Sequence, residues 1–290
     1  MLGDEVSDAT LASLPLNVRE LFEQHVEALP EAERQIERLT TAFDGPFAND
    51  PVTVAFMLLG IRCRTFHRGI VHSLEGPSPR SAEPTLRALI EANLLLRYFE
   101  QGYHEGNLEQ RLGLWAAETE RSRLAIHDDI SRMDAAARAR CEGGMLSESD
   151  RKRMREIVAA AQDAAITAEV RGAQTKGRLL PTTGQMVELL KGGATEAYTV
   201  GYRPLSAATH ISEASFAGDY ARDEQTISWS DDLPITRRVA TRVFALTAYA
   251  SALCPVSLIC GLGFGDEADE VKRRFIPHDI PLADRLAPTP

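Results

Sequence analysis

The stretch PTLRALIEANLLLRYF, residues 84–99, decides the fold of this chain. Apolar side chains surround the segment on nearly every face, which is typical of a helix buried inside a protein. Two polar pairs interrupt that surface at i,i+4 spacing, Arg87 with Glu91 and Asn93 with Arg97. Because buried charges need partners, we expect other parts of the chain to supply polar groups to this helix.

Helix boundary signals continue on both sides of this stretch. Asp50 and Pro51 predict the N-cap and first residue of a helix that ends at Gly76. A longer helix is expected over 108–140, and Pro234 predicts the start of the last long helix. Strands do not alternate with helices, and no internal repeat is present. The sequence therefore predicts an all-α fold, a bundle of about eight to ten helices with no significant sheet.

Three finer features complete the expected organisation. Asn107 and Gln110 form a capping-box pattern at the start of the 108–140 helix. A short helix is expected over 183–190, and a short extended piece over 226–229.

The chain divides into three expected parts. Residues 1–48 form an N-terminal helical extension, 49–265 the core of the helical bundle, and 266–290 a proline-rich tail. At 290 residues with 44% hydrophobic side chains, the chain is long enough to bury a substantial core.

Charge and composition exclude several classes of protein. A formal net charge of −10 argues against a protein that coats DNA or an anionic membrane. The four cysteines lack zinc-site spacing, so we expect reduced thiols and neither a metal nor a cofactor. The N-terminal sequence MLGDEVSDATLAS has acidic residues where a signal peptide needs a basic region, which predicts a cytoplasmic protein.

The segment 243–265 contains no charged residue and is long enough to span a bilayer. Hydroxyl side chains, Pro255 and three glycines make it only mildly hydrophobic. We therefore expect a buried core helix, and no membrane partner, in preference to a membrane span.

Familiar catalytic motifs are absent from the sequence. It has no HExxH, no Glu-x-x-His and no GxSxG, which excludes the usual zinc-protease, di-iron and α/β-hydrolase sites. The most informative constellation is Tyr202, Ser206 and His210, whose spacing places three hydrogen-bonding side chains on one helix face. We expect this face to meet Arg87 and Glu91 in one polar network. A network that only fixes packing remains an equal alternative.

The same residues carry a resemblance to a known family. Arg87 and Glu91, with Arg111 and the segment YRPLSAATHIS over 202–212, resemble a bacterial family of helical domains of unknown function. The resemblance spans roughly 50–215 and implies a helical bundle with a polar interior.

A second resemblance is to HEPN ribonucleases, helical effectors whose active site has the form Arg-x4–6-His. Arg203 and His210 have this spacing, as do other arginine–histidine pairs of the chain. The resemblance implies a homodimer. It also implies that His210 takes the proton of a ribose 2′-hydroxyl while Arg203 stabilises the charge on the phosphate.

Three functions follow as hypotheses. The first is a metal-independent RNA-cleaving effector of the toxin or defence type, with Arg203 and His210 catalytic and Tyr202 and Ser206 nearby. The second is a non-catalytic regulatory protein whose polar network is structural. The third is an enzyme or binding protein for a small molecule, with Arg87, Glu91 and His210 at the floor of its pocket.

Overall fold

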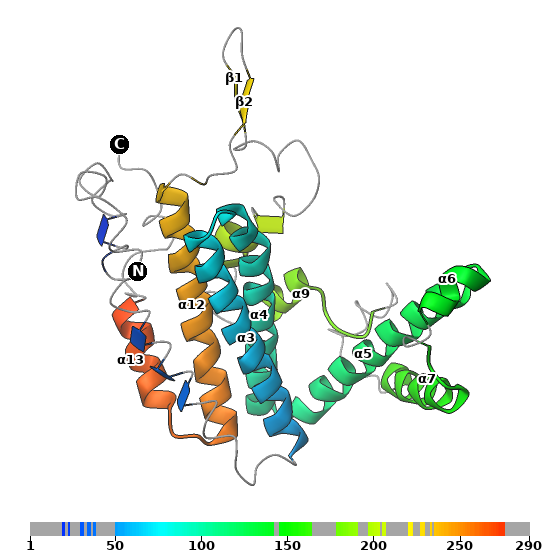
Figure 1. The fold of residues 1–290 in the computed structure, drawn as a ribbon. Coiled ribbons are helices and arrows are strands. Elements are labelled where there is room, and N and C mark those ends of the chain that lie inside the picture. The colour runs from blue at the N-terminus through cyan, green and yellow to red at the C-terminus, as the bar shows by residue number, and fades with distance from the viewer. Residues whose placement is uncertain are drawn as a thin grey trace. The chain divides into compact units, whose positions relative to one another are not determined.

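The fold was analysed in a computed structural model. It describes residues 19–20, 23, 30–31, 34–35, 37–38, 50–141, 145–163, 178–190, 197–203, 205–206, 220–222, 227–229, 233 and 235–275. These residues contain eight α-helices, and their only strands form one short hairpin (Figure 1). The predicted all-α class is confirmed.

The chain divides into two compact units. The first comprises Met1–Tyr98 and Leu190–Pro290, and the second comprises Phe99–Leu189. The boundary falls inside helix α4 (Ala82–Glu105), which contains the stretch that decides the fold. The predicted core over 49–265 therefore contains residues of both units.

Helix α3 (Pro51–Glu75) begins and ends where the sequence predicts. Oδ2 of Asp50 accepts a hydrogen bond from the backbone N–H of Thr53 at 2.8 Å, and Pro51 occupies the first turn. Gly76 caps the C-terminal end. Asp50 satisfies a backbone donor that has no partner inside the helix, which is why the boundary can be predicted from local sequence.

Helix α12 (Ile235–Cys260) packs beside α3 in the first unit (Figure 1). Contacts at three levels show that the two helices are antiparallel. They pair Gly60 with Val256, His67 with Tyr249, and Glu75 with Arg242. The α12 segment Arg237–Cys260 is long and apolar enough to cross a membrane, yet 67% of its most apolar window is buried inside the structure. This burial agrees with the predicted core helix, although Pro255 lies within the helix and does not end it.

Helix α13 (Gly265–Phe275) lies beside α12 and occupies the first part of the expected proline-rich tail, 266–290. Gly261 and Gly263 adopt positive φ angles of 60° and 71° in the turn before it. Two residues of the expected N-terminal extension contact this helix. Gln35 donates a hydrogen bond to the backbone oxygen of Glu267 at 3.1 Å, and Arg38 pairs with the Glu267 carboxylate at 2.6 Å.

The second unit contains α5 (Leu108–Ser131), α6 (Ala135–Arg140), α7 (Glu148–Asp163) and α9 (Thr183–Leu189). The prediction of one helix over 108–140 is wrong, because the chain breaks between α5 and α6. Oδ1 of Asp134 accepts a hydrogen bond from the N–H of Ala137 at 2.8 Å and so starts a second helix. The capping box is also wrong, since the Asn107 side chain makes no capping hydrogen bond to α5. The short helix predicted over 183–190 is confirmed as α9.

The remaining elements are short. They are the 3₁₀ turn η2 (Pro79–Ser81), the π-helical turn η4 (Ala197–Tyr202), and strands β1 (Tyr220–Arg222) and β2 (Ile227–Trp229). The strands are antiparallel, with Ala221 opposite Ser228. The extended piece predicted over 226–229 corresponds to β2. Of these elements, η4 matters most for the site, because it ends at Tyr202.

Candidate functional site

Helix α4 and the turn η4 bring three of the predicted residues together in the first unit. Arg87 and Glu91 lie one turn apart on α4, and Nε of Arg87 is 3.3 Å from Oε1 of Glu91. The Tyr202 hydroxyl donates to the same Glu91 oxygen at 2.8 Å and accepts from Nη2 of Arg87 at 3.2 Å. Of the predicted network that joins Tyr202, Ser206 and His210 to Arg87 and Glu91, these contacts join Arg87, Glu91 and Tyr202. We call Arg87, Glu91 and Tyr202 the clamp.

Two guanidinium groups and two rings form a stack in the order Arg87, Tyr202, Tyr198, Arg203. Arg87 lies over the Tyr202 ring at 5.2 Å, and the Tyr198 and Tyr202 rings are stacked at 5.1 Å and 15°. Arg203 in turn lies over the Tyr198 ring at 5.5 Å. Each cation–ring contact is favourable because the ring face carries negative potential. The stack joins Arg203 to the clamp through two aromatic side chains.

The clamp lies at the surface of the core, although the sequence predicts a buried pair. The side chains of Arg87 and Glu91 are 24% and 42% exposed, and only Tyr202, at 8%, is buried. The apolar pattern of residues 84–99 does not reveal this, because Arg87 and Glu91 face the η4 segment, which is distant in sequence. Water can therefore reach Glu91, and the ion pair itself contributes little stability.

Hydrogen bonding keeps Arg87 charged. Burial lowers the pKa of Arg87, but its contacts with Tyr202 and Glu91 outweigh burial and raise that pKa above its ordinary value. The clamp thus contains one permanent cation, one carboxylate and one phenol. Because Arg87 and Glu91 neutralise each other, Arg203 supplies the unpaired positive charge among the described residues of this stack.

The structure describes two of the other three predicted site residues. Arg203 is exposed, and Ser206 is half-buried one turn further along the chain. His210, the second predicted catalytic residue, lies outside the described residues. The structure therefore places Arg203 near the clamp and leaves its relation to His210 as a prediction.

Tyr198 is the residue that sequence reasoning missed. It precedes Tyr202 by four positions, and that spacing could have indicated two rings on one side of a helical turn. Within the described part of the chain, no three His, Cys, Asp or Glu side chains are close enough to hold a metal ion.

Comparison with known proteins identifies no relative of this chain. No family model, curated protein sequence or solved structure matches it.

Proposed function

We propose that this protein is a metal-independent ribonuclease that acts on single-stranded RNA, with Arg203 and His210 as its catalytic residues. The observation that best supports this proposal is the exposed Arg203 guanidinium, which is stacked on Tyr198 beside the clamp. A toxin or defence effector would use this activity in the cytoplasm, as a homodimer.

Single-stranded RNA suits the chemistry of this surface. Unstacked bases bind to aromatic rings and guanidinium planes, and the phosphate backbone needs a cation. Arg203 is exposed and lies over the half-buried Tyr198 ring, so its guanidinium plane presents a permanent positive charge at the end of the stack. The formal net charge of −10 makes a local arginine all the more necessary for binding a polyanion.

The proposed reaction is an internal transesterification. His210 takes the proton of the ribose 2′-hydroxyl, and the 2′-oxygen forms a bond to the adjacent phosphorus. The bond from phosphorus to the 5′-oxygen breaks, which yields a 2′,3′-cyclic phosphate and a 5′-oxygen that takes a proton from water. The hydroxide left behind takes the proton held by His210, which restores the neutral imidazole. Arg203 stabilises the charge that develops on the phosphate oxygens.

The clamp is assigned a positioning role in this proposal. Tyr202 immediately precedes Arg203 in the chain, so hydrogen bonds that fix its hydroxyl on α4 also restrict the backbone that carries Arg203. Arg87, Glu91 and Tyr202 then affect catalysis through the position of Arg203, without contact with the scissile phosphate. Ser206 lies one turn beyond and would contact the bound RNA.

Cleavage of a fluorescein-labelled single-stranded RNA by the full chain in EDTA tests the proposal. We expect wild type to cleave RNA but not DNA of the same sequence, because DNA lacks the 2′-hydroxyl. Arg203→Ala and His210→Ala should each lower the rate by about 100-fold or more. Tyr202→Phe should lower it by less than about tenfold, because the ring stack remains.

Matched substitutions elsewhere supply the controls. Arg132→Ala removes an exposed arginine that pairs with the exposed Asp129, and His104→Ala removes an exposed histidine. Both should keep the wild-type rate. Absence of cleavage by wild type, or equal loss in the Arg132 and Arg203 variants, would contradict the proposal.

A second function is favoured by the closure of the clamp. Arg87, Glu91 and Tyr202 bond one another in a complete triangle, as a purely structural network would. In that case the protein is a non-catalytic regulatory or interaction protein. Wild type would then leave RNA intact, and Tyr202→Phe would only lower the thermal midpoint.

A further inference from the structure

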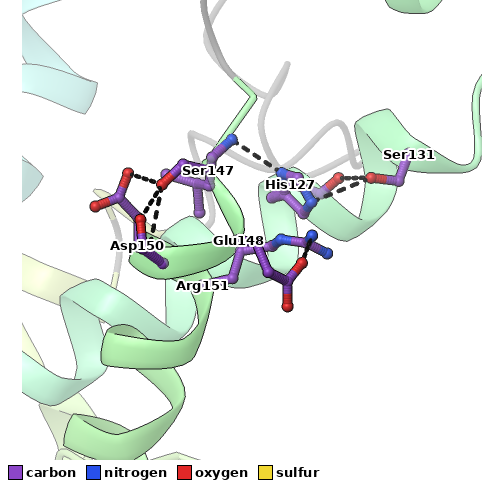
Figure 2. A network of polar contacts seen from close by, with 8 residues as sticks. His127, Ser131, Ser147, Glu148, Asp150 and Arg151 are labelled. Carbon is purple, nitrogen blue, oxygen red and sulfur yellow. Dashed lines mark hydrogen bonds and ion pairs between the residues drawn. The ribbon is translucent and has the colours of Figure 1, made fainter.

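A buried histidine in the second unit connects α5 to the segment that leads into α7 through a backbone hydrogen bond. His127 lies on α5 and is 3% exposed. Its Nδ1 accepts a hydrogen bond from the backbone N–H of Leu146 at 3.1 Å, and its Nε2 lies 3.4 Å from the Ser131 hydroxyl. Figure 2 shows the ring between Ser131 and the segment that leads into α7.

These contacts require a neutral imidazole with the proton on Nε2. The Leu146 N–H can only donate, so Nδ1 must present a lone pair. The Ser131 hydroxyl donates to the backbone oxygen of His127 at 2.8 Å, which leaves its own lone pairs for Nε2–H. A second proton on the ring would place two N–H donors, those of Nδ1 and Leu146, against each other.

The charged groups around the ring already have partners. On α7, Glu148 pairs with Arg151, and the Asp150 carboxylate accepts from the Ser147 hydroxyl at 2.6 Å (Figure 2). On α5, Arg123 pairs with Glu120 one turn before the histidine. Asp128 and Asp129 follow His127 in the chain and are exposed to water. In the described part of the second unit, the ring nitrogens contact Leu146 and Ser131 and none of these carboxylates, so no carboxylate favours the charged form of the ring.

We propose that His127 is a pH-sensitive latch that holds the start of α7 against α5 and releases it when the imidazole is protonated. Near neutral pH the ring accepts from Leu146 and the latch is closed. Acidification puts a proton on Nδ1, the hydrogen bond is lost, and the Leu146–Ser147 segment separates from α5. The latch lies wholly in the second unit and is independent of the proposed ribonuclease activity.

The sign of the effect follows from proton binding. The closed form requires the neutral ring and therefore binds fewer protons than the open form, so protonation of the ring weakens closure and acid favours the open form.

Hydrogen exchange of the full chain, followed by mass spectrometry, tests the latch. Rates at about pH 7.5 and pH 5.5 are compared after correction for intrinsic exchange. Peptides covering 145–163 should exchange about fivefold faster at the lower pH, which corresponds to loss of one hydrogen bond. Peptides from α3 should show no such change.

Two substitutions separate the latch from a general effect of acid. His127→Asn places an amide oxygen near the position of Nδ1 and cannot titrate, so its exchange over 145–163 should not depend on pH. His104→Gln removes an exposed histidine of the same unit and should keep the wild-type response. Equal acceleration in the Asn variant, or none in wild type, would overturn the proposal.

If His127→Asn fails to fold, the tautomer of the wild-type His127 ring tests the latch. Nitrogen chemical shifts of the imidazole at about pH 7.5 should show a protonated Nε2 and a bare Nδ1. A protonated Nδ1 would contradict the latch.

Discussion

The two units use different forces to hold their parts together. In the first, α3 and α12 pack mainly through apolar side chains, with the buried His67 and Tyr249 rings in contact between them. In the second, two side chains of α5 accept backbone N–H groups from later segments: Glu118 from Leu179 at 2.8 Å and His127 from Leu146. Apolar packing does not depend on charge, whereas the hydrogen bond to Glu118 is weakened when its carboxylate is protonated. Acid should therefore weaken the contact between α5 and Leu179 and leave the apolar contacts between α3 and α12 unchanged.

The largest expected effect comes from the apolar core of the first unit. Phe56 on α3 is fully buried, so Phe56→Ala should destabilise that unit by about 3–5 kcal/mol. Hydrogen exchange of α12 peptides in the full chain measures the change. Leu58→Ala, at an exposed position of the same helix, should stay within about 0.5 kcal/mol. Equal effects of the two substitutions would contradict an apolar origin of stability.

Glu118 supplies the pH dependence expected from a carboxylate. Burial raises the pKa of Glu118, but hydrogen bonds from Arg121 and the Leu179 N–H, with the charge of Arg121, lower it below the ordinary 4.5. The stabilisation is therefore present above pH 4.5 and is lost as pH falls through the lower, folded-state pKa.

Glu118→Gln should remove that pH dependence and weaken the contact by about 1–2 kcal/mol at neutral pH. Exchange of the 178–190 peptides reports the contact. Glu109→Gln, at an exposed position of the same helix, is the matched control. If the 178–190 peptides of Glu118→Gln still respond to acid as in wild type, a side chain other than Glu118 causes that response.

Tyr202→Phe should have a smaller effect on stability. The hydroxyl loses two hydrogen bonds, but Arg87 and Glu91 are partly exposed and regain water, so the cost should be about 1 kcal/mol. Peptides covering 197–206 should exchange faster, while those of α12 stay unchanged. A global loss of protection would mean that the clamp belongs to the core of the first unit and not to its edge.

The smallest effect is expected at the start of α6. Asp134→Ala removes the cap of a helix that has no buried residue, so about 1 kcal/mol should be lost within α6 alone. Asp134→Asn keeps a capping oxygen and serves as the control. Circular dichroism of the full chain should barely change, and exchange at 135–140 should rise only in the Ala variant. A decrease in the thermal midpoint would show that α6 supports the rest of its unit.

The sequence predicts two kinds of feature well: helix boundaries set by neighbouring residues, and charged side chains that need a polar partner. The boundaries of α3 are set by three residues at its two ends, namely Asp50, Pro51 and Gly76. Arg87 and Glu91 were expected to need polar partners, and Tyr202 is one. Such demands can be read from sequence, because an unsatisfied polar group is costly wherever the chain folds.

Sequence reasoning failed where helical periodicity continues through a break. The pattern over 108–140 suits one helix, and only the Asp134 cap, a weak signal among many acidic residues, divides it. The exposure of Glu91 and the stacking of Tyr198 depend on how η4 meets α4, which is set by tertiary packing. The His127 contact likewise joins residues 19 positions apart through a backbone N–H, which leaves no trace in side-chain patterns.

Photocrosslinking to a single-stranded RNA that contains 4-thiouridine tests most directly whether the first unit carries the RNA site. We expect crosslinked peptides to contain Tyr198 or Tyr202, and Arg203→Ala to abolish them while Arg132→Ala does not. Crosslinks confined to residues 99–189, or equally strong in the Arg203 variant, would contradict the proposed site.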